Sequence, residues 1–302
     1  MKTTLIAALL VSTASLPAFA ESWTDTYKLV RFGVSAAENQ KDTIAKYAPL
    51  EQYLEKRFGV DFEIFPASNY DGVIQALAAD QIEFAYLGTS SYGAAYTATN
   101  GGVVPMLAKL KKDGTSGYVS VIVTRCDSGA ASVADLKGKV HAFPDPDSTS
   151  GFAVPFYNLV QQGYDPSKHF ASFSFSGNHE AGVQGVVNGT FDSASTWAYT
   201  PEDGAVSRMV AKGMVKEGEV CQIWQSPEIT GDPFTARSNL PAAMIADVKQ
   251  ALIDVVTQDP AAWSAMDGGT DTHVGWIEVE HDLYVWIIEM REWLKSYRRS
   301  QG

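Results

Sequence analysis

Short apolar runs alternate with segments of helical periodicity along most of this chain. Strand-like runs at 28–35, 61–65 and 82–87 are separated by segments with helical spacing at 41–58 and 70–79. This order is typical of βαβ units, in which parallel strands form a sheet and the connecting helices cover its faces. We therefore predict an α/β fold.

The alternation restarts after Cys126 and breaks again at Ser226-Pro227. A chain of 302 residues is about twice the length of a typical single domain. These features predict a first lobe of residues 21–125 with 228–302 and a second lobe of 126–227. Two crossings, near residues 125 and 227, would act as hinges beside a ligand cleft.

The first 20 residues have the features of a secretory signal peptide. A basic start at Lys2 precedes the apolar run 5–11, and Ala18-Phe19-Ala20 is a small-x-small cleavage site before Glu21. The apolar run is too short for a membrane anchor, and the absence of a nearby cysteine argues against a lipoprotein. We expect cleavage after Ala20 and a periplasmic protein.

Export bears on Cys126 and Cys221, the two cysteines of the chain. An oxidising compartment allows a disulfide. A bond requires the two Cα atoms to lie within about 7 Å, which sequence spacing does not reveal. Whether the two cysteines pair is left open by the sequence.

The charge of the chain excludes one class of partner. With 35 acidic and 23 basic residues the net charge is -12, so the basic surface that nucleic acids require is missing. A small anion remains a possible ligand, because backbone N–H groups, helix N-termini and hydroxyls bind anions without a cationic surface.

Two hydroxyl-rich segments follow strands and open helices. Ser148, Thr149 and Ser150 lie in the segment 145–152, and Thr89 and Ser90 follow the strand at 82–87. Unpaired N–H groups and the helix dipole favour an anion there, and we expect these hydroxyls to bind it. The alternative is ordinary helix capping, in which the hydroxyls bind only their own backbone.

Three further residues are candidates for a ligand site. His179 follows Ser176-Gly177-Asn178 and opens a helix, where it would bind an anion best when protonated; the alternative is a surface histidine. Trp197 and Tyr199 end a strand, where they would stack on a ligand substituent or pack between lobes. The five histidines show no close ligand spacing, so we predict no metal site.

These segments resemble the periplasmic phosphonate-binding proteins of ABC phosphonate importers. The resemblance runs from about Phe32 to Leu240, in the same order and spacing, and includes these segments: 69–75, the strand ending at Gly88, 116–118, 145–152, 177–180, 226–227 and 231–233. It implies a two-lobed type II periplasmic-binding-protein fold that closes over a phosphonate or phosphate ester. It also implies a monomer without cofactor, whose partners are an inner-membrane permease and its ATPase.

The resemblance assigns roles to single residues. The positions that hold phosphonate oxygens match Tyr70, Ser148, Thr149, Ser150 and His179. In the best-studied members a carboxylate pair holds the amine of 2-aminoethylphosphonate.

Here Asp232 matches one member of that pair, Tyr199 stands at the other, and Leu87 stands at a tyrosine position. One carboxylate fewer disfavours a primary amine. We expect a methylated ammonium, a larger organic group or a small apolar group instead.

Two other functions remain in competition. A secreted enzyme acting on phosphoesters would need a metal cluster or an activated nucleophile beside the anion site, and neither pattern is evident. A sensor that presents its ligand to a membrane receptor would use the same fold. We predict a binding protein without enzymatic activity.

Overall fold

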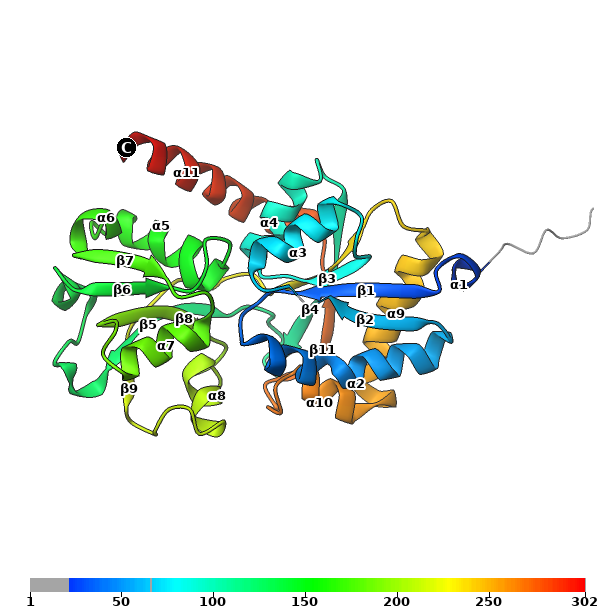
Figure 1. Cartoon of the computed structure of the whole chain (residues 1–302), viewed down its shortest axis with the longest axis horizontal. Helices are drawn as coiled ribbons and strands as arrows, with labels where there is room; N and C mark the ends of the chain where they lie inside the picture. The colour runs from blue at the N-terminus through cyan, green and yellow to red at the C-terminus, as the bar shows by residue number, and fades with distance from the viewer. Residues whose placement is uncertain (1–21, 66, 302) are drawn as a thin grey trace, which may run out of the picture.

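The structure is a computed structural model that describes residues 22–65 and 67–301. Its strands form two sheets, and each sheet with its helices makes one lobe (Figure 1). The predicted signal peptide lies outside the described residues. In the described part of the chain, no helix is both long and apolar enough to cross a membrane.

The first lobe is built on a six-stranded sheet in the order β11-β4-β10-β3-β1-β2. The strands β1, β2 and β3 are parallel, and β10 and β11 both run antiparallel to β4. Its strands are β1 (Leu29–Val34), β2 (Asp61–Phe65), β3 (Phe84–Tyr86), β4 (Val103–Lys111), β10 (Pro233–Arg237) and β11 (His273–Glu278). Its helices are α1 (Trp23–Thr26), α2 (Gln40–Phe58), α3 (Tyr70–Ala78), α4 (Thr89–Ala98), α9 (Ala242–Gln258) and α10 (Pro260–Met266).

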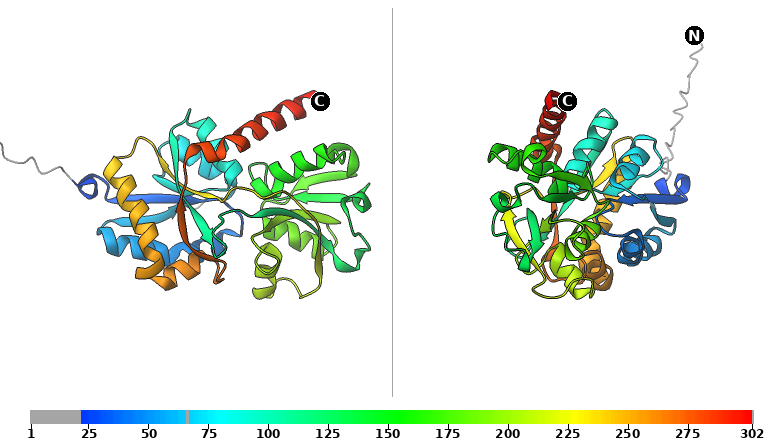
Figure 2. Two further views of the ribbon diagram at one scale, coloured as in Figure 1. Left: turned by 180° about the vertical axis from the view of Figure 1, so that it is seen from behind. Right: turned by 60° about the vertical axis from the view of Figure 1, so that its left-hand side comes forward.

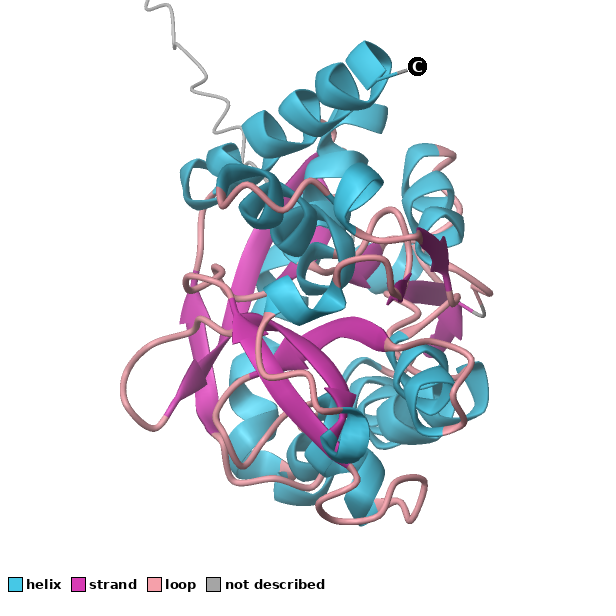
Figure 3. Ribbon diagram, turned by 90° about the vertical axis from the view of Figure 1, so that its left-hand side faces the viewer, coloured by secondary structure: helices cyan, strands magenta, loops and turns pink. Residues whose placement is uncertain are grey.

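The second lobe has a five-stranded sheet in the order β7-β6-β8-β5-β9, covered by helices on both faces (Figure 3). Here β6, β7 and β8 are parallel, and β5 is antiparallel to β8 and β9. Its strands are β5 (Val119–Arg125), β6 (Val140–Phe143), β7 (Ser172–Phe175), β8 (Ser193–Ala198) and β9 (Val220–Gln225). Its main helical segments are the π-helical turn η3 (Thr149–Ala153), α5 (Val154–Gln161), α6 (Pro166–His169), α7 (His179–Val187) and α8 (Ala205–Ala211).

The inner parallel strand β3 is apolar because helices cover both faces of its sheet, whereas the edge strands β2 and β7 alternate with polar residues. In the first lobe Phe32 and Phe84 pack toward α2 and α9, whereas Ala85 and Leu87 pack toward α3 and α4. Neighbouring residues of one strand thus enter two different cores, as the two-residue period of a strand requires.

The two crossings run side by side between the lobes. They connect β4 to β5 and β9 to β10, and Tyr118 and Ile229 exchange backbone hydrogen bonds of 3.0 and 2.7 Å between them. The second crossing, residues 226–232, contains the predicted site near residue 227. The first lies at 112–118 and not near residue 125, because β5 pairs with β8 and β9 and so belongs to the second lobe.

The last helix, α11 (Val285–Gln301), also departs from the predicted lobe boundaries. It leaves the first lobe beside α4 and extends over α5 of the second lobe (Figures 1 and 2). Trp293 packs against Tyr157 with ring centroids 4.9 Å apart, and Tyr297 packs against Phe156 at 6.1 Å. The amphipathic pattern of this segment identifies an apolar face but not the lobe that covers it.

Cys126 and Cys221 form a disulfide, with Cα atoms 4.9 Å apart. Cys126 directly follows β5, and Cys221 lies opposite Thr124 on the neighbouring strand β9. Sheet pairing thus brings together two residues that are 95 positions apart in the chain.

Candidate functional site

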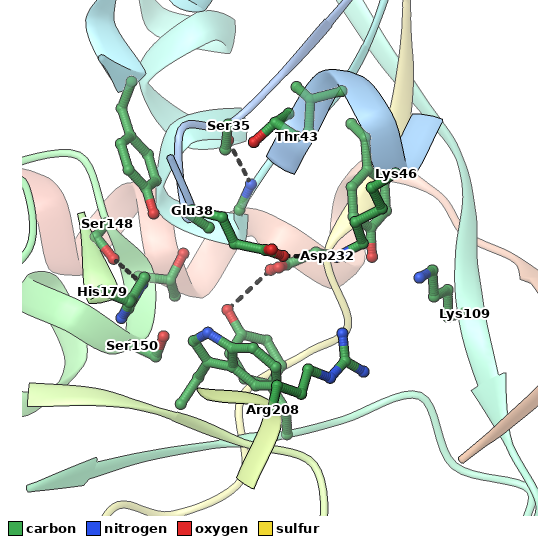
Figure 4. A pocket seen from close by; sticks show the side chains of 18 of the residues that line it. Ser35, Glu38, Thr43, Lys46, Lys109, Ser148, Ser150, His179, Arg208 and Asp232 are labelled. Carbon is green, nitrogen blue, oxygen red and sulfur yellow. Dashed lines mark hydrogen bonds and ion pairs between the residues drawn. The ribbon is translucent and has the colours of Figure 1, made fainter. Parts of the chain in front are cut away.

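A cavity of about 90 Å³ lies between the two lobes (Figure 4). A single water needs about 10–15 Å³ in the same measure, so a small molecule fits. The lining residues are Val34, Ser35, Ala37, Glu38, Thr43, Lys46, Tyr47, Tyr70, Tyr86, Gly88, Lys109, Tyr118, Ser148, Thr149, Ser150, His179, Trp197, Tyr199, Arg208 and Asp232.

Several helices begin at this cavity. In the first lobe α3 starts at Tyr70, and α4 starts directly after Gly88; in the second lobe η3 starts at Thr149, and α7 starts at His179. These helices follow β2, β3, β6 and β7, so their first turns lie at the carboxyl ends of parallel strands. The dipoles of these helices, from both lobes, therefore favour an anion in the cavity, although the first-turn N–H groups of Thr89 and Ser90 are taken by Asp232 and Thr149.

The Ser148–Ser150 segment both caps its helix and lines the cavity. The Ser148 hydroxyl accepts a hydrogen bond from the Gly151 N–H at 3.0 Å, and the Thr149 hydroxyl accepts one from the Ser90 N–H at 2.7 Å. A Cβ on Gly151 would lie 2.6 Å from Ser148 Oγ, so this tight turn needs glycine. From the sequence, helix capping and a place in the ligand site were alternatives for these hydroxyl groups. In the structure, the same segment caps a helix and also lines the cavity.

His179 is buried, with 3% of its surface exposed, and is not a surface histidine. Its Nδ1 lies 3.0 Å from Thr196 Oγ1, and its Nε2 lies 3.3 Å from Ser148 Oγ. Burial lowers the pKa of the imidazole to about 3, so the ring is neutral at physiological pH. His179 would bind an anion best when protonated, but here the ring is neutral and offers one N–H donor.

Tyr70 and Tyr118 bring two phenol groups to the cavity, and burial raises the pKa of both. Both hydroxyls therefore stay protonated and are hydrogen-bond donors. Tyr118 already donates to Asp232 Oδ1 at 2.8 Å. Tyr70 lies beside Ser148, and both residues line the cavity.

Trp197, Tyr199 and Asp232 line the cavity, as expected. The two aromatic rings lie 5.1 Å apart, and the Arg208 guanidinium lies 5.0 Å from the centre of the Trp197 ring. Asp232 Oδ1 accepts from the Tyr118 hydroxyl and from the Thr89 N–H at 3.0 Å. Burial raises the pKa of Asp232 to about 6.

Leu87, Thr89 and Ser90 do not line the cavity. Leu87 packs into the core under α3 and α4, and its neighbour Tyr86 reaches the cavity instead, because adjacent strand residues face opposite sides. Thr89 binds Asp232 and the Thr230 carbonyl, and Ser90 binds Thr149 through its N–H. Thr89 and Ser90 therefore orient residues that do line the cavity.

Sequence reasoning missed the charged side chains of the cavity, namely Glu38, Lys46, Lys109 and Arg208. The sequence holds a signal for Lys109, because this basic residue interrupts the apolar run Leu107-Ala108-Lys109-Leu110. In the structure the run belongs to an inner strand of the sheet, and Lys109 is 6% exposed. The other three lie near the starts of helices or within one, where charged residues are common.

Charged groups join the lobes at the mouth of the cleft. Glu38 and Asp42 of the first lobe gather with Glu180 of the second, and Lys212 Nζ lies 2.7–3.0 Å from all three carboxylates. Burial would raise the pKa of Glu38, but Lys46 and Lys212 outweigh it and lower the pKa to about 2. Glu38 is therefore ionised, and Lys212 links the two lobes through its ion pairs with Glu38 and Asp42.

Lys212→Met should weaken ligand binding although Lys212 does not line the cavity. Two partly exposed ion pairs between the lobes contribute about 0.2–1 kcal/mol each, so we expect affinity to fall about 2- to 30-fold through faster dissociation. Stopped-flow binding measures this. Lys168→Met is the matched control, because the Lys168–Asp165 pair lies within the second lobe. Equal kinetics in both variants would remove Lys212 from the closure.

The fold and the cavity together define a two-lobed ligand-binding protein, whose interlobe cavity has the size of a small molecule. A family model described as "ABC transporter, phosphonate, periplasmic substrate-binding protein" matches residues 32–284. The chain belongs to this family of periplasmic substrate-binding proteins.

Two relatives illustrate the family. The phosphate-import protein PhnD of Mycolicibacterium smegmatis is 33% identical over 223 residues, which cover 70% of this chain and 67% of that protein. The phosphonates-binding periplasmic protein of Escherichia coli is 31% identical over 234 residues, 76% of this chain and 66% of that protein. The chain thus spans about two thirds of the length of these relatives.

Solved structures show the same fold. PhnD1 of Prochlorococcus marinus in complex with methylphosphonate superposes with a TM-score of 0.75 at 20% identity, over 89% of this chain and 98% of that one. A binding protein of a phosphonate transporter from Pseudomonas aeruginosa also superposes with a TM-score of 0.75. It is 21% identical, over 87% of this chain and 85% of that one. The predicted two-lobed type II periplasmic-binding-protein fold is confirmed.

Proposed function

We propose that this chain is the solute-binding component of an ABC importer and that it captures a phosphonate or a phosphate ester. The observation that carries the proposal is the convergence of helix N-termini and hydroxyl groups from both lobes on one enclosed cavity. The related proteins are named for phosphate or phosphonates, or were solved with methylphosphonate. These compounds share a tetrahedral phosphorus with several charged oxygens.

In this proposal five side chains hold the phosphorus oxyanion. They are Tyr70, Ser148, Thr149, Ser150 and His179, and each lies at the first turn of a helix or caps it. Neutral donors suit a buried anion, because they stabilise its charge without adding a buried cation that needs its own partner. Trp197, Tyr199 and Asp232 would contact the substituent, where one carboxylate beside an aromatic ring disfavours a primary amine.

Closure links the cavity to transport. Both lobes line the cavity, so a ligand makes more contacts in the closed form than in an open one and shifts the equilibrium toward closure. The closed monomer would then deliver its ligand from the periplasm to an inner-membrane permease and its ATPase. Residues 1–20 would act as the export signal, and no cofactor takes part.

The alternative of a phosphoester-cleaving enzyme finds weak support at Ser148 and His179. Their 3.3 Å contact resembles a nucleophile beside a base. However, a histidine with a pKa of about 3 is a poor base near neutral pH, and its other nitrogen contacts Thr196 instead of a carboxylate. The Ser148 hydroxyl also accepts the capping bond from Gly151. The geometry favours binding without turnover.

Calorimetric titration with ligands whose head groups share one shape but differ in charge tests the proposal. Methylphosphonate should bind at least about tenfold more tightly than methanesulfonate, because the phosphonate carries the larger negative charge toward the same N–H and O–H donors. Incubation with a phosphoester, with and without added divalent metals, should release no phosphate. Absence of binding to every phosphonate and phosphate ester tried would overturn the proposal, and turnover would favour the enzyme.

A further inference from the structure

The end of the cavity opposite the helix starts is rich in basic side chains. Within the described residues, Lys46, Lys109 and Arg208 line the cavity against the carboxylates of Glu38 and Asp232 (Figure 4). Lys46 is neutralised by Glu38 at 2.8 Å. Lys109 and Arg208 are paired with Asp267 and Asp203, two carboxylates that lie outside the lining.

Lys109 comes from the middle of the first sheet, and its ammonium is held in place from behind. Nζ donates to the Met266 carbonyl at 3.0 Å and to Asp267 Oδ1 at 3.1 Å. The same oxygen also binds His273 Nδ1 at 2.7 Å, so one carboxylate oxygen serves both groups. An ammonium has three donors. The third N–H of Lys109 is therefore left for a ligand.

Arg208 is held in a similar way from the second lobe. Its Nε and Nη2 bind Asp203 at 2.7 and 3.1 Å, which fixes the guanidinium over the Trp197 ring. Asp203 also accepts from the Thr272 hydroxyl at 2.6 Å, so its charge is shared. The second terminal nitrogen, Nη1, makes no hydrogen bond among the described residues and lies beside Gly268, at the edge of the cavity.

Positive charges accumulate at this end of the cavity. Burial lowers the pKa of Lys109 to about 8; Asp267 opposes this shift, while Lys46 and Arg208 add to it by repulsion. A primary ammonium on the ligand would add another cation beside these groups. A carboxylate would accept hydrogen bonds from them and relieve their repulsion.

Asp232 has only its Oδ2 left to accept from an ammonium. Its Oδ1 already accepts from Tyr118 and from both the N–H and the hydroxyl of Thr89. Tyr199 stands where the best-studied members of the family have the second carboxylate. Its ring packs against His273 in a T-shaped arrangement, with centroids 4.5 Å apart.

We infer that the ligand carries a carboxylate in addition to its phosphonate, and that Lys109 and Arg208 receive this second anion. The inference rests on the proposed function, because the phosphonate occupies the helix starts and thereby directs its substituent toward the basic end. The ligand class is then a short phosphonocarboxylate.

Calorimetry with ligands of matched length tests the inference. Phosphonoacetate and 3-phosphonopropionate should bind at least about tenfold more tightly than ethylphosphonate and propylphosphonate, since the carboxylate accepts charge-assisted hydrogen bonds that an alkyl group lacks. The amine 2-aminoethylphosphonate should bind more weakly than phosphonoacetate. Equal or weaker binding of the carboxylates than of the alkylphosphonates would overturn the inference and leave the proposed function intact.

Variants locate the second anion. Lys109→Met should remove most of the carboxylate advantage, measured as the ratio of the affinities of the same variant for phosphonoacetate and ethylphosphonate. Lys109→Met removes one counter-charge from the buried Asp267 carboxylate. The double variant Lys109→Met/Asp267→Asn and the single variant Arg208→Gln are therefore measured as well. A carboxylate advantage that persists in all three variants would also overturn the inference. Failure of every phosphonate to bind wild-type protein would instead overturn the proposed function.

Discussion

Loss of the Cys126–Cys221 disulfide should lower the free energy of unfolding by about 2–5 kcal/mol. The bond ties β9, an edge strand, to the end of β5 and closes a segment of 95 residues that contains most of the second lobe. In the chain-entropy account a loop of this length contributes about 4.7 kcal/mol by restricting the unfolded chain. Urea unfolding of Cys126→Ser/Cys221→Ser measures the loss.

Reductant provides the control for that experiment. Wild-type protein treated with dithiothreitol should unfold like the double variant, and the variant itself should not respond to dithiothreitol. The affinity of the folded double variant for a phosphonate should change little, because neither cysteine lines the cavity. Equal stability of the oxidised and reduced wild-type protein would show that the bond does not restrain the unfolded chain.

Ser148→Ala and His179→Ala should each weaken phosphonate binding by about 1–3 kcal/mol, or roughly 5- to 150-fold. Each variant removes a buried donor from the oxyanion end of the cavity, where water cannot easily replace it. Calorimetric titration of each variant with methylphosphonate gives the change in affinity. Unchanged affinity in both variants would exclude these residues from the site.

The cap formed by Ser148 requires a separate control. Loss of its bond to the Gly151 N–H is expected to lower stability by about 0.5–2 kcal/mol even without a ligand. Ser132→Ala is the matched variant, because Ser132 also caps a helical turn but lies exposed and away from the cavity. Both variants should lose thermal stability, whereas Ser148→Ala alone should lose affinity.

The structure explains how a strongly acidic protein can receive an anion. The net charge of -12 is a property of the whole chain, whereas the cavity presents helix N-termini, neutral hydroxyls and two basic side chains with outer counter-ions. Over short distances inside a protein these groups outweigh remote surface charges, which water and salt screen. Global charge therefore excluded nucleic acids but did not exclude a phosphonate.

Local features of this protein follow from the sequence by itself. The alternation of strands and helices, the helix starts at Tyr70, Ser148 and His179, and the aromatic pair at Trp197 and Tyr199 were all predicted. They depend on periodicity and on capping chemistry, which act over a few residues. The resemblance to phosphonate-binding proteins rested on the same short segments, and the family match bears it out.

Only the tertiary structure decided which distant residues meet. It placed β5 in the second lobe, carried α11 across both lobes and paired Cys126 with Cys221. It also brought Lys109 and Arg208 to one cavity and turned Leu87 away from it. Sheet pairing and lobe closure are contacts between residues far apart in the chain, and no local pattern of side chains specifies their partners.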